Sequence, residues 1–121
     1  MSHHILVVDD NNTNLNLVSK ILKIEGYEVT TAASGLEALE KVNMVKYDLA
    51  VLDVMMPHMN GFELCRRMRQ LPTCADIPII MLTASSDEED RIMGEKAGAT
   101  AMLGKPFDVD ALNKQIHKYL E

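Results

Sequence analysis

The sequence predicts an α/β fold: a single domain over residues 1–121, built on a doubly wound, five-stranded parallel sheet with five helices. Five short apolar runs bounded by polar residues are typical of strands that are buried on both faces of a parallel sheet. Helical patterns separate these runs, so that strand and helix alternate along the chain. A content of 47% hydrophobic and 25% charged residues, without repeats or a long linker, suits one globular domain.

The predicted strands all run in the same direction. They lie at residues 4–10 (HILVVDD), 27–32 (YEVTTA), 48–53 (DLAVLD), 77–84 (IPIIMLTA) and 99–105 (ATAMLGK). Right-handed crossovers would bring the carboxyl end of every strand to the same edge of the sheet. For the strand order 2-1-3-4-5, we expect ligands at that edge between strands one and three, where the winding reverses.

The helices are predicted from apolar residues at helical spacing and from capping signals. These apolar residues are Leu15, Val18 and Leu22 in the first helix, Ala38, Leu39 and Val42 in the second, Leu64, Met68 and Leu71 in the third, and Val109, Leu112, Ile116 and Tyr119 in the fifth. Gly26 and Pro72 would end the first and third helices, while Ser34 and Asp108 would begin the second and fifth. The fourth, over about residues 87–96, follows SSDEED, where we expect serine caps and a favourable acidic first turn.

The net charge of −6 argues against direct binding of nucleic acid, which requires a basic face. The basic cluster Arg66, Arg67 and Arg69 is predicted to be a solvated helix face. No apolar run approaches the roughly 20 residues that span a bilayer, and the N-terminal segment has no signal-peptide pattern. We therefore predict a cytoplasmic protein without direct membrane contact.

The cysteines and histidines show no ligand or disulfide pattern. Cys65 and Cys74 are too few for a disulfide framework and lack CxxC spacing, so we predict reduced, structural thiols. The histidines are not spaced as metal ligands.

Polar residues that could bind a cation or take part in a reaction stand at the ends of the predicted strands. Asp9 and Asp10 follow the first strand, Asp53 ends the third, Thr83 lies at the end of the fourth, and Lys105 follows the fifth. An isolated carboxylate beside an apolar core is costly, so Asp53 needs a partner. Three crowded carboxylates repel one another unless a hard divalent cation neutralises them.

Mg²⁺, or Mn²⁺ in its place, would meet that requirement. Because Mg²⁺ keeps several positions for water and substrate oxygens, a metal held by Asp10 and Asp53 would leave room for a phosphoryl group. Lys105 would neutralise one phosphoryl oxygen and Thr83 would donate to another. The carboxylate of Asp53 is then a plausible nucleophile that forms an acyl phosphate.

Four motifs carry a resemblance to the response-regulator receiver domains of two-component signalling. They are LVVDDN with Asp9 and Asp10, LDVMMPHMNG with Asp53, MLTA with Thr83, and GKPF with Lys105. The resemblance covers essentially the whole chain and implies a flavodoxin-like receiver fold. It implies a regulatory phosphoacceptor rather than an enzyme: Asp53 would take its phosphoryl group from a sensor histidine kinase or a histidine phosphotransfer protein and lose it slowly.

The same resemblance implies a ligand set and an output surface. Asp10, Asp53 and the backbone carbonyl of Met55 would bind the metal directly, while Asp9 would act mainly through water. Phosphorylation would change the surface of the fourth helix, fifth strand and fifth helix, which would contact a downstream partner or a second copy of the chain. The output would come from that partner, if the regulator stands alone, or from a linked domain of a longer protein.

Loop residues around the site are also implied by the resemblance. Pro57 and Gly61 would shape the loop after the phosphoacceptor, in keeping with their turn chemistry. The peptide bond between Lys105 and Pro106 would be cis and would help to aim the lysine side chain.

The sequence departs from the commonest receiver pattern at two positions. Met102 stands where the family usually has a switching Tyr or Phe, and Gly104 stands where Ser or Thr is common. A flexible Met can still change rotamer, so we predict that switching survives with weaker conformational discrimination. Met55 and Ser85 occupy positions that tune phosphoryl lifetime, and neither is an acid or amide that readily orients water. We therefore predict slow dephosphorylation.

Three alternatives stay open on the sequence alone. A phosphatase of the haloacid dehalogenase type also uses an Asp nucleophile, although Met55 stands where its general acid would be. A flavodoxin would share the fold class, but the loop DDNNTN is acidic where a flavin phosphate needs a cradle. The third alternative is an interaction module that works without phosphorylation.

Overall fold

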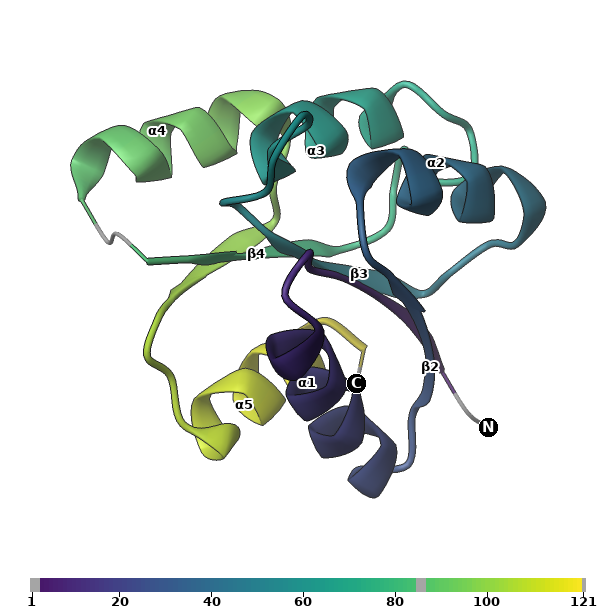
Figure 1. The fold of residues 1–121 in the computed structure, drawn as a ribbon, viewed down its shortest axis with the longest axis vertical. Helices are drawn as coiled ribbons and strands as arrows, with labels where there is room; N and C mark the ends of the chain where they lie inside the picture. Colours follow the sequence, from purple (N-terminus) through teal and green to yellow (C-terminus); the bar gives the residue numbers. More distant parts are fainter. Residues whose placement is uncertain (1–2, 85–86, 121) are drawn as a thin grey trace.

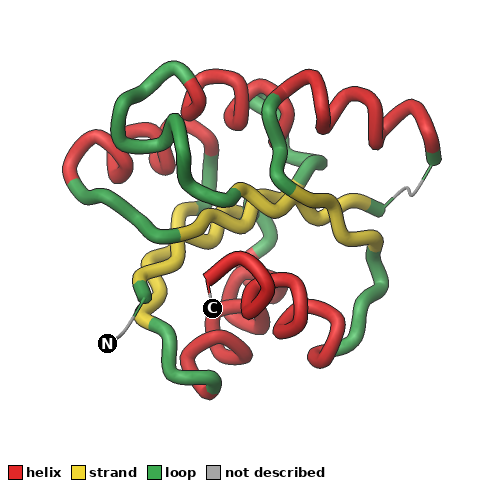
Figure 2. Tube along the Cα trace, turned by 180° about the vertical axis from the view of Figure 1, so that it is seen from behind, coloured by secondary structure: helices red, strands yellow, loops and turns green. Residues whose placement is uncertain are grey.

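The computed structural model describes residues 3–84 and 87–120, and it confirms the predicted α/β fold. Five parallel strands form one sheet in the order β2-β1-β3-β4-β5. The strands are β1 (His4–Val8), β2 (Glu28–Ala32), β3 (Leu49–Asp53), β4 (Ile79–Thr83) and β5 (Ala101–Gly104). Figures 1 and 2 show the sheet as the middle of three layers.

Helices cover both faces of the sheet. They are α1 (Asn12–Ile24), α2 (Gly35–Met44), α3 (Gly61–Arg69), α4 (Glu88–Ala97) and α5 (Val109–Leu120). In Figure 1, α2, α3 and α4 lie above the sheet, while α1 and α5 lie below it. Each layer encloses its own apolar cluster, and β3 and β4 are buried at every position. This burial explains why those strands read as continuous apolar runs rather than as alternating ones.

Side-chain caps fix most of the helix starts. The side chains of Asn11, Ser34 and Asn60 accept hydrogen bonds from backbone N–H groups in the first turns of α1, α2 and α3. Asp108 does the same for α5, where the N–H of Ala111 donates to Oδ1 at 2.7 Å. Such caps satisfy donors that the helix itself leaves unpaired.

Three details of the helices differ from the predictions. The N-cap of α4 is Asp87, not a serine, and its carboxylate accepts a hydrogen bond from the N–H of Asp90. The predicted serine caps, Ser85 and Ser86, lie outside the described residues. Leu71 falls beyond α3, because the chain leaves the helix at Gln70. Val109 is 50% exposed, so it begins α5 without joining the core.

The ladder of backbone hydrogen bonds continues past the strand ends. The N–H groups of Asp9, Val54 and Lys105 donate to the carbonyl oxygens of neighbouring strands or their ends, at 3.1, 2.9 and 2.7 Å. These bonds hold the segments that follow β1, β3 and β5 at the same edge of the sheet. The polar residues in these segments are thereby fixed relative to one another before any side-chain contact is considered.

The basic cluster on α3 is only partly the solvated face that the sequence predicts. Arg66 and Arg67 do lie at the surface and pair with Glu63 at 2.9 Å. Arg69 is half-buried instead, and its guanidinium donates to the carbonyl oxygens of Gly98, Cys74, Ala75 and Ile77 at 2.6–3.3 Å. It therefore ties the end of α3 to the segments before β4 and after α4.

The cysteines form no disulfide, as the sequence predicts. Cys65 and Cys74 are free and buried, and burial raises the pKa of both thiols. Among the helices of residues 3–84 and 87–120, none is both long and apolar enough to cross a bilayer.

We expect Arg69→Ala to lower the free energy of unfolding by about 2–3 kcal/mol, since it leaves several carbonyl groups without their charged donor. Arg66→Ala is the matched control on the same helix, and its exposed ion pair contributes about 0.5 kcal/mol or less. Urea unfolding of both variants measures the difference. Equal losses would contradict a structural role for Arg69.

Candidate functional site

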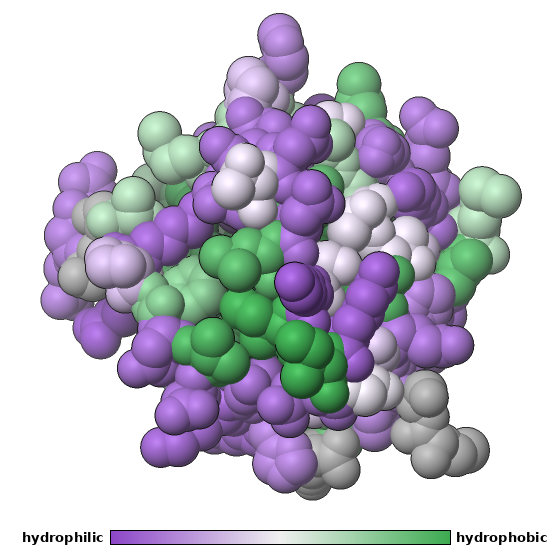
Figure 3. All heavy atoms as spheres, turned by 60° about the horizontal axis from the view of Figure 1, so that its bottom comes forward, coloured by the Kyte–Doolittle hydropathy of each residue, from purple (hydrophilic) through white to green (hydrophobic). Residues whose placement is uncertain are grey.

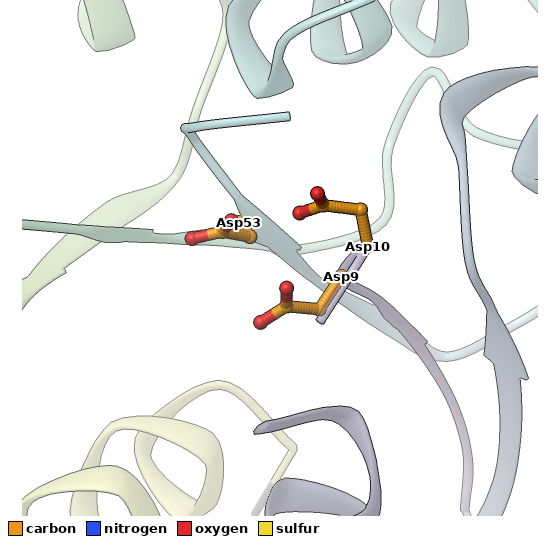
Figure 4. Close-up of side chains that lie close together, drawn as sticks. All are labelled: Asp9, Asp10 and Asp53. Carbon is orange, nitrogen blue, oxygen red and sulfur yellow. The ribbon is translucent and has the colours of Figure 1, made fainter. Parts of the chain in front are cut away.

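Three carboxylates meet at the carboxyl edge of the sheet, between β1 and β3. Carboxylate oxygens of Asp9, Asp10 and Asp53 all lie within 4.8 Å of one another. Asp9 and Asp53 are buried, while Asp10 is exposed. Figure 4 shows the side chains next to one another at the ends of the two strands, which is where the strand order reverses.

One ammonium group reaches this cluster. Nζ of Lys105 lies 2.6 Å from Oδ1 of Asp53, and the side chain of Lys105 is 28% exposed. The Lys105–Pro106 peptide bond is cis, as the resemblance implies. The lysine therefore gives Asp53 the partner that a buried carboxylate requires.

The charge at this edge remains unbalanced. Burial raises the pKa of Asp9 above its ordinary value, and the nearby charge of Asp53 raises it further. The N–H of Asn11 donates a hydrogen bond to Asp9 at 2.9 Å. This bond and the charge of Lys105 lower the pKa of Asp9, but the net shift is still upward. Three oxygen-donor groups with an excess of negative charge match the ligand preference of a hard divalent cation.

The loop between β3 and α3 depends on a close backbone approach at Gly61. The N–H of Gly61 donates to the carbonyl of Val54 at 2.9 Å. A Cβ atom on Gly61 would lie 2.5 Å from the carbonyl oxygen of Asp53, which is too close for any side chain. Within the same loop, Pro57 and Met55 are exposed, the latter to 71%, so Met55 borders the site without filling it.

Thr83 ends β4 and is buried, and its hydroxyl donates to Oδ2 of Asp90 on α4 at 3.3 Å. The sequence analysis did not identify Asp90. It stands in a run of acidic residues, and such a run gives no signal for which side chain turns inward. The contact between Thr83 and Asp90 thus connects the end of β4 to α4.

Met102 on β5 is half-buried and packs against the core beneath α4. A Cβ atom on Gly94 of α4 would overlap Sδ of Met102. The absent side chain of Gly94 is therefore what lets the helix approach the methionine so closely. Ser85, which the sequence analysis paired with Met55 as a position that tunes phosphoryl lifetime, lies outside the described residues.

An apolar hollow opens beside Lys105, on the α1 side of the sheet. Its volume is about 390 Å³, and its lining includes Leu17, Pro106 and Phe107. Figure 3 views the molecule from the side of α1 and α5 and shows a group of apolar side chains framed by polar ones. Leu17 is 55% exposed, so this region presents apolar surface next to the carboxylates.

Comparison with known proteins gives one consistent family. The model for the response regulator receiver domain matches residues 5–117. The chain is 41% identical over 120 residues to the alkaline phosphatase synthesis transcriptional regulatory protein PhoP of Bacillus subtilis, covering 99% of this chain and 49% of that protein. It is 44% identical over 108 residues to the response regulator PleD of Caulobacter vibrioides, covering 89% of this chain and 24% of that protein.

Solved structures that resemble this chain point to the same family. Chemotaxis protein CheY4 of Vibrio cholerae superposes with a TM-score of 0.96 at 38% identity, covering 99% of this chain and 100% of that one. A second match is the receiver domain of sensor histidine kinase PA1611 from Pseudomonas aeruginosa, which was solved with a magnesium ion in its active-site cleft. It superposes with a TM-score of 0.91 at 30% identity, covering 98% of each chain. The chain thus spans a complete CheY-type structure but half or less of the two curated regulators.

We expect Asp9→Asn to raise the free energy of unfolding at pH 7 in the presence of a chelator. The pKa of Asp9 is raised in the folded protein, so its ionised form destabilises the fold, and this cost disappears as the pH falls through the raised pKa toward the ordinary value of 3.8. Urea unfolding at pH 7 and about pH 4 measures the gain, which should shrink at the lower pH. The exposed Asp10→Asn is the control and should gain less. A gain for Asp9→Asn that is independent of pH would contradict this explanation.

Proposed function

The chain belongs to the response regulator receiver domain family, and from that premise we propose that Asp53 accepts a phosphoryl group from a phosphohistidine. Receiver domains are regulatory phosphoacceptors of two-component signalling rather than conventional enzymes. The donor in this proposal is a sensor histidine kinase or a histidine phosphotransfer protein. The family match sets aside the phosphatase and flavodoxin alternatives.

The observation that carries the proposal is the 2.6 Å contact between Lys105 and Asp53 beside two further carboxylates. A carboxylate oxygen of Asp53 attacks the phosphorus, and the bond between phosphorus and the donor imidazole nitrogen breaks. The electron pair returns to the imidazole, which takes a proton from solvent. Little bond chemistry is asked of the protein, so positioning and charge neutralisation supply most of the effect.

Lys105 and Thr83 would stabilise the transferred group. The ammonium of Lys105 already lies against Asp53 and would neutralise charge on one phosphoryl oxygen. The hydroxyl of Thr83, at the end of the adjacent strand, would donate to another. These roles use groups from three strand ends, which supports the carboxyl edge as the site of transfer.

The carboxylate cluster fits Mg²⁺, or Mn²⁺ in its place. We propose that Asp10, Asp53 and the backbone carbonyl of Met55 hold the cation, with Asp9 acting through water. Three oxygen donors within 4.8 Å and the raised pKa of Asp9 support this assignment. When bound, the cation would neutralise negative charge that builds up as phosphate meets carboxylate.

We propose two contact surfaces for partners. The apolar hollow beside Lys105 would receive the phosphohistidine donor, because it adjoins Asp9 and Lys105 directly. The face formed by α4, β5 and α5 would carry the output, either to a separate protein, to a linked domain or to a second copy of the chain. Thr83 contacts α4 through Asp90, which supports a connection between the two surfaces. In this proposal residues 1–121 form one receiver domain.

Incubation with acetyl phosphate and Mg²⁺ should add the mass of one phosphoryl group to the intact protein. Asp53→Asn removes the nucleophile while keeping the side-chain shape, and a chelator removes the cation, so each should abolish the gain. Intact-mass spectrometry measures all three samples. No gain with acetyl phosphate or with a phosphohistidine donor would instead favour an interaction module that works without phosphorylation.

Met55→Asn should shorten the lifetime of the acyl phosphate several-fold. The position is exposed beside Asp53, and an amide there can orient an attacking water, which the thioether of Met55 cannot. Release of inorganic phosphate from the phosphorylated protein measures the rate. Met55→Leu is the control of similar size and should decay like the parent protein. Equal rates for the Asn and Leu variants would contradict the tuning role.

A further inference from the structure

Asp90 contacts the threonine at the end of β4. Oγ1 of Thr83 donates to Oδ2 of Asp90 across 3.3 Å, and Asp90 is half-buried in the first turn of α4. The bond is longer than the 2.5–3.0 Å of an ordinary O–H···O hydrogen bond, so it is weak and easily exchanged. Its acceptor carries charge, which favours it over a neutral acceptor at the same distance.

The same face of α4 makes a second close contact with the sheet. Gly94 is one helical turn beyond Asp90 and therefore lies on the same side of the helix. Its missing side chain makes room for Sδ of Met102 on β5. This face of α4 therefore meets the sheet through a polar contact with Thr83 and an apolar contact with Met102.

A hydroxyl group has one proton and can donate one hydrogen bond at a time. In the proposed function, the hydroxyl of Thr83 donates to a phosphoryl oxygen on Asp53. The carboxylate of Asp90 and the phosphoryl group therefore compete for the same proton. Whichever acceptor holds the hydroxyl, the other loses it.

We propose that Asp90 is a positioning residue, which holds the hydroxyl of Thr83 against α4 and thereby opposes its donation to the phosphoryl group on Asp53. This inference rests on the proposed function and goes beyond it by identifying the contact that phosphorylation must break. Because coupling between two equilibria is reciprocal, a phosphoryl group on Asp53 weakens the hold of Asp90 on Thr83 to the same degree. The first turn of α4 then loses its contact with the end of β4.

The experiment titrates beryllofluoride, a phosphoryl analogue, with Mg²⁺ into the full chain and follows backbone amide shifts by NMR. Asp90→Ala removes the competing acceptor. Glu89→Ala is the matched control, since it removes the same charge from an exposed neighbour in the same helical turn. The half-saturating beryllofluoride concentration of Asp90→Ala should be about one third of that of Glu89→Ala. A ratio of this size is the effect of one weak hydrogen bond. Asp90→Asn, which keeps an acceptor oxygen, should fall between the parent and Asp90→Ala.

The same pair of variants on a Thr83→Val background separates positioning from general structure. Valine has the shape of threonine without its hydroxyl, so the excess effect of Asp90→Ala over Glu89→Ala should vanish there. An excess that persists on this background, or equal effects of the two variants in the parent, would overturn the role of Asp90. If the parent protein takes up no beryllofluoride, while Asp53→Asn behaves identically, the proposed function itself fails and the inference fails with it.

Discussion

Crowding of like charges at the carboxyl edge of the sheet is the constraint on which this molecule depends. Parallel strands end together, so Asp9 and Asp53 are forced close to each other and to Asp10. Lys105 offsets part of that charge from the end of β5. The fold tolerates the remaining repulsion because the two apolar layers on either side of the sheet stabilise the strands that carry these residues.

The remaining negative charge is what suits this edge to binding a divalent cation. A site whose negative charge were already neutralised would gain little from a divalent cation, whereas the raised pKa of Asp9 records a charge that still needs a partner. In the proposed function, stability and cation binding therefore oppose each other at Asp9, as is common where ionisable groups are held in unfavourable surroundings. The close approach of Gly61 to the backbone of Asp53 fixes the loop that follows this residue.

Two side-chain contacts connect this edge of the sheet to α4. Thr83 ends a fully buried strand, yet its hydroxyl contacts a charged residue on α4. Met102 meets the same helix at Gly94, and a flexible thioether can refill space when its neighbours move. In the proposed function, a small change at the edge shifts α4 through these contacts without disturbing the strands.

The alternation of apolar runs and helical periods was enough to predict the fold class and the edge at which the aspartates gather, since burial and periodicity are local properties of a sequence. The strand order came with the fold class and not from any local pattern. Caps such as Ser34 and Asp108 could be predicted for the same reason, because a cap acts within its own turn. Only the tertiary structure separated Arg69 from Arg66, or turned Asp90 rather than Glu89 toward Thr83. These side chains find their partners on other elements, and the choice depends on how the helices pack against the sheet, which no local pattern encodes.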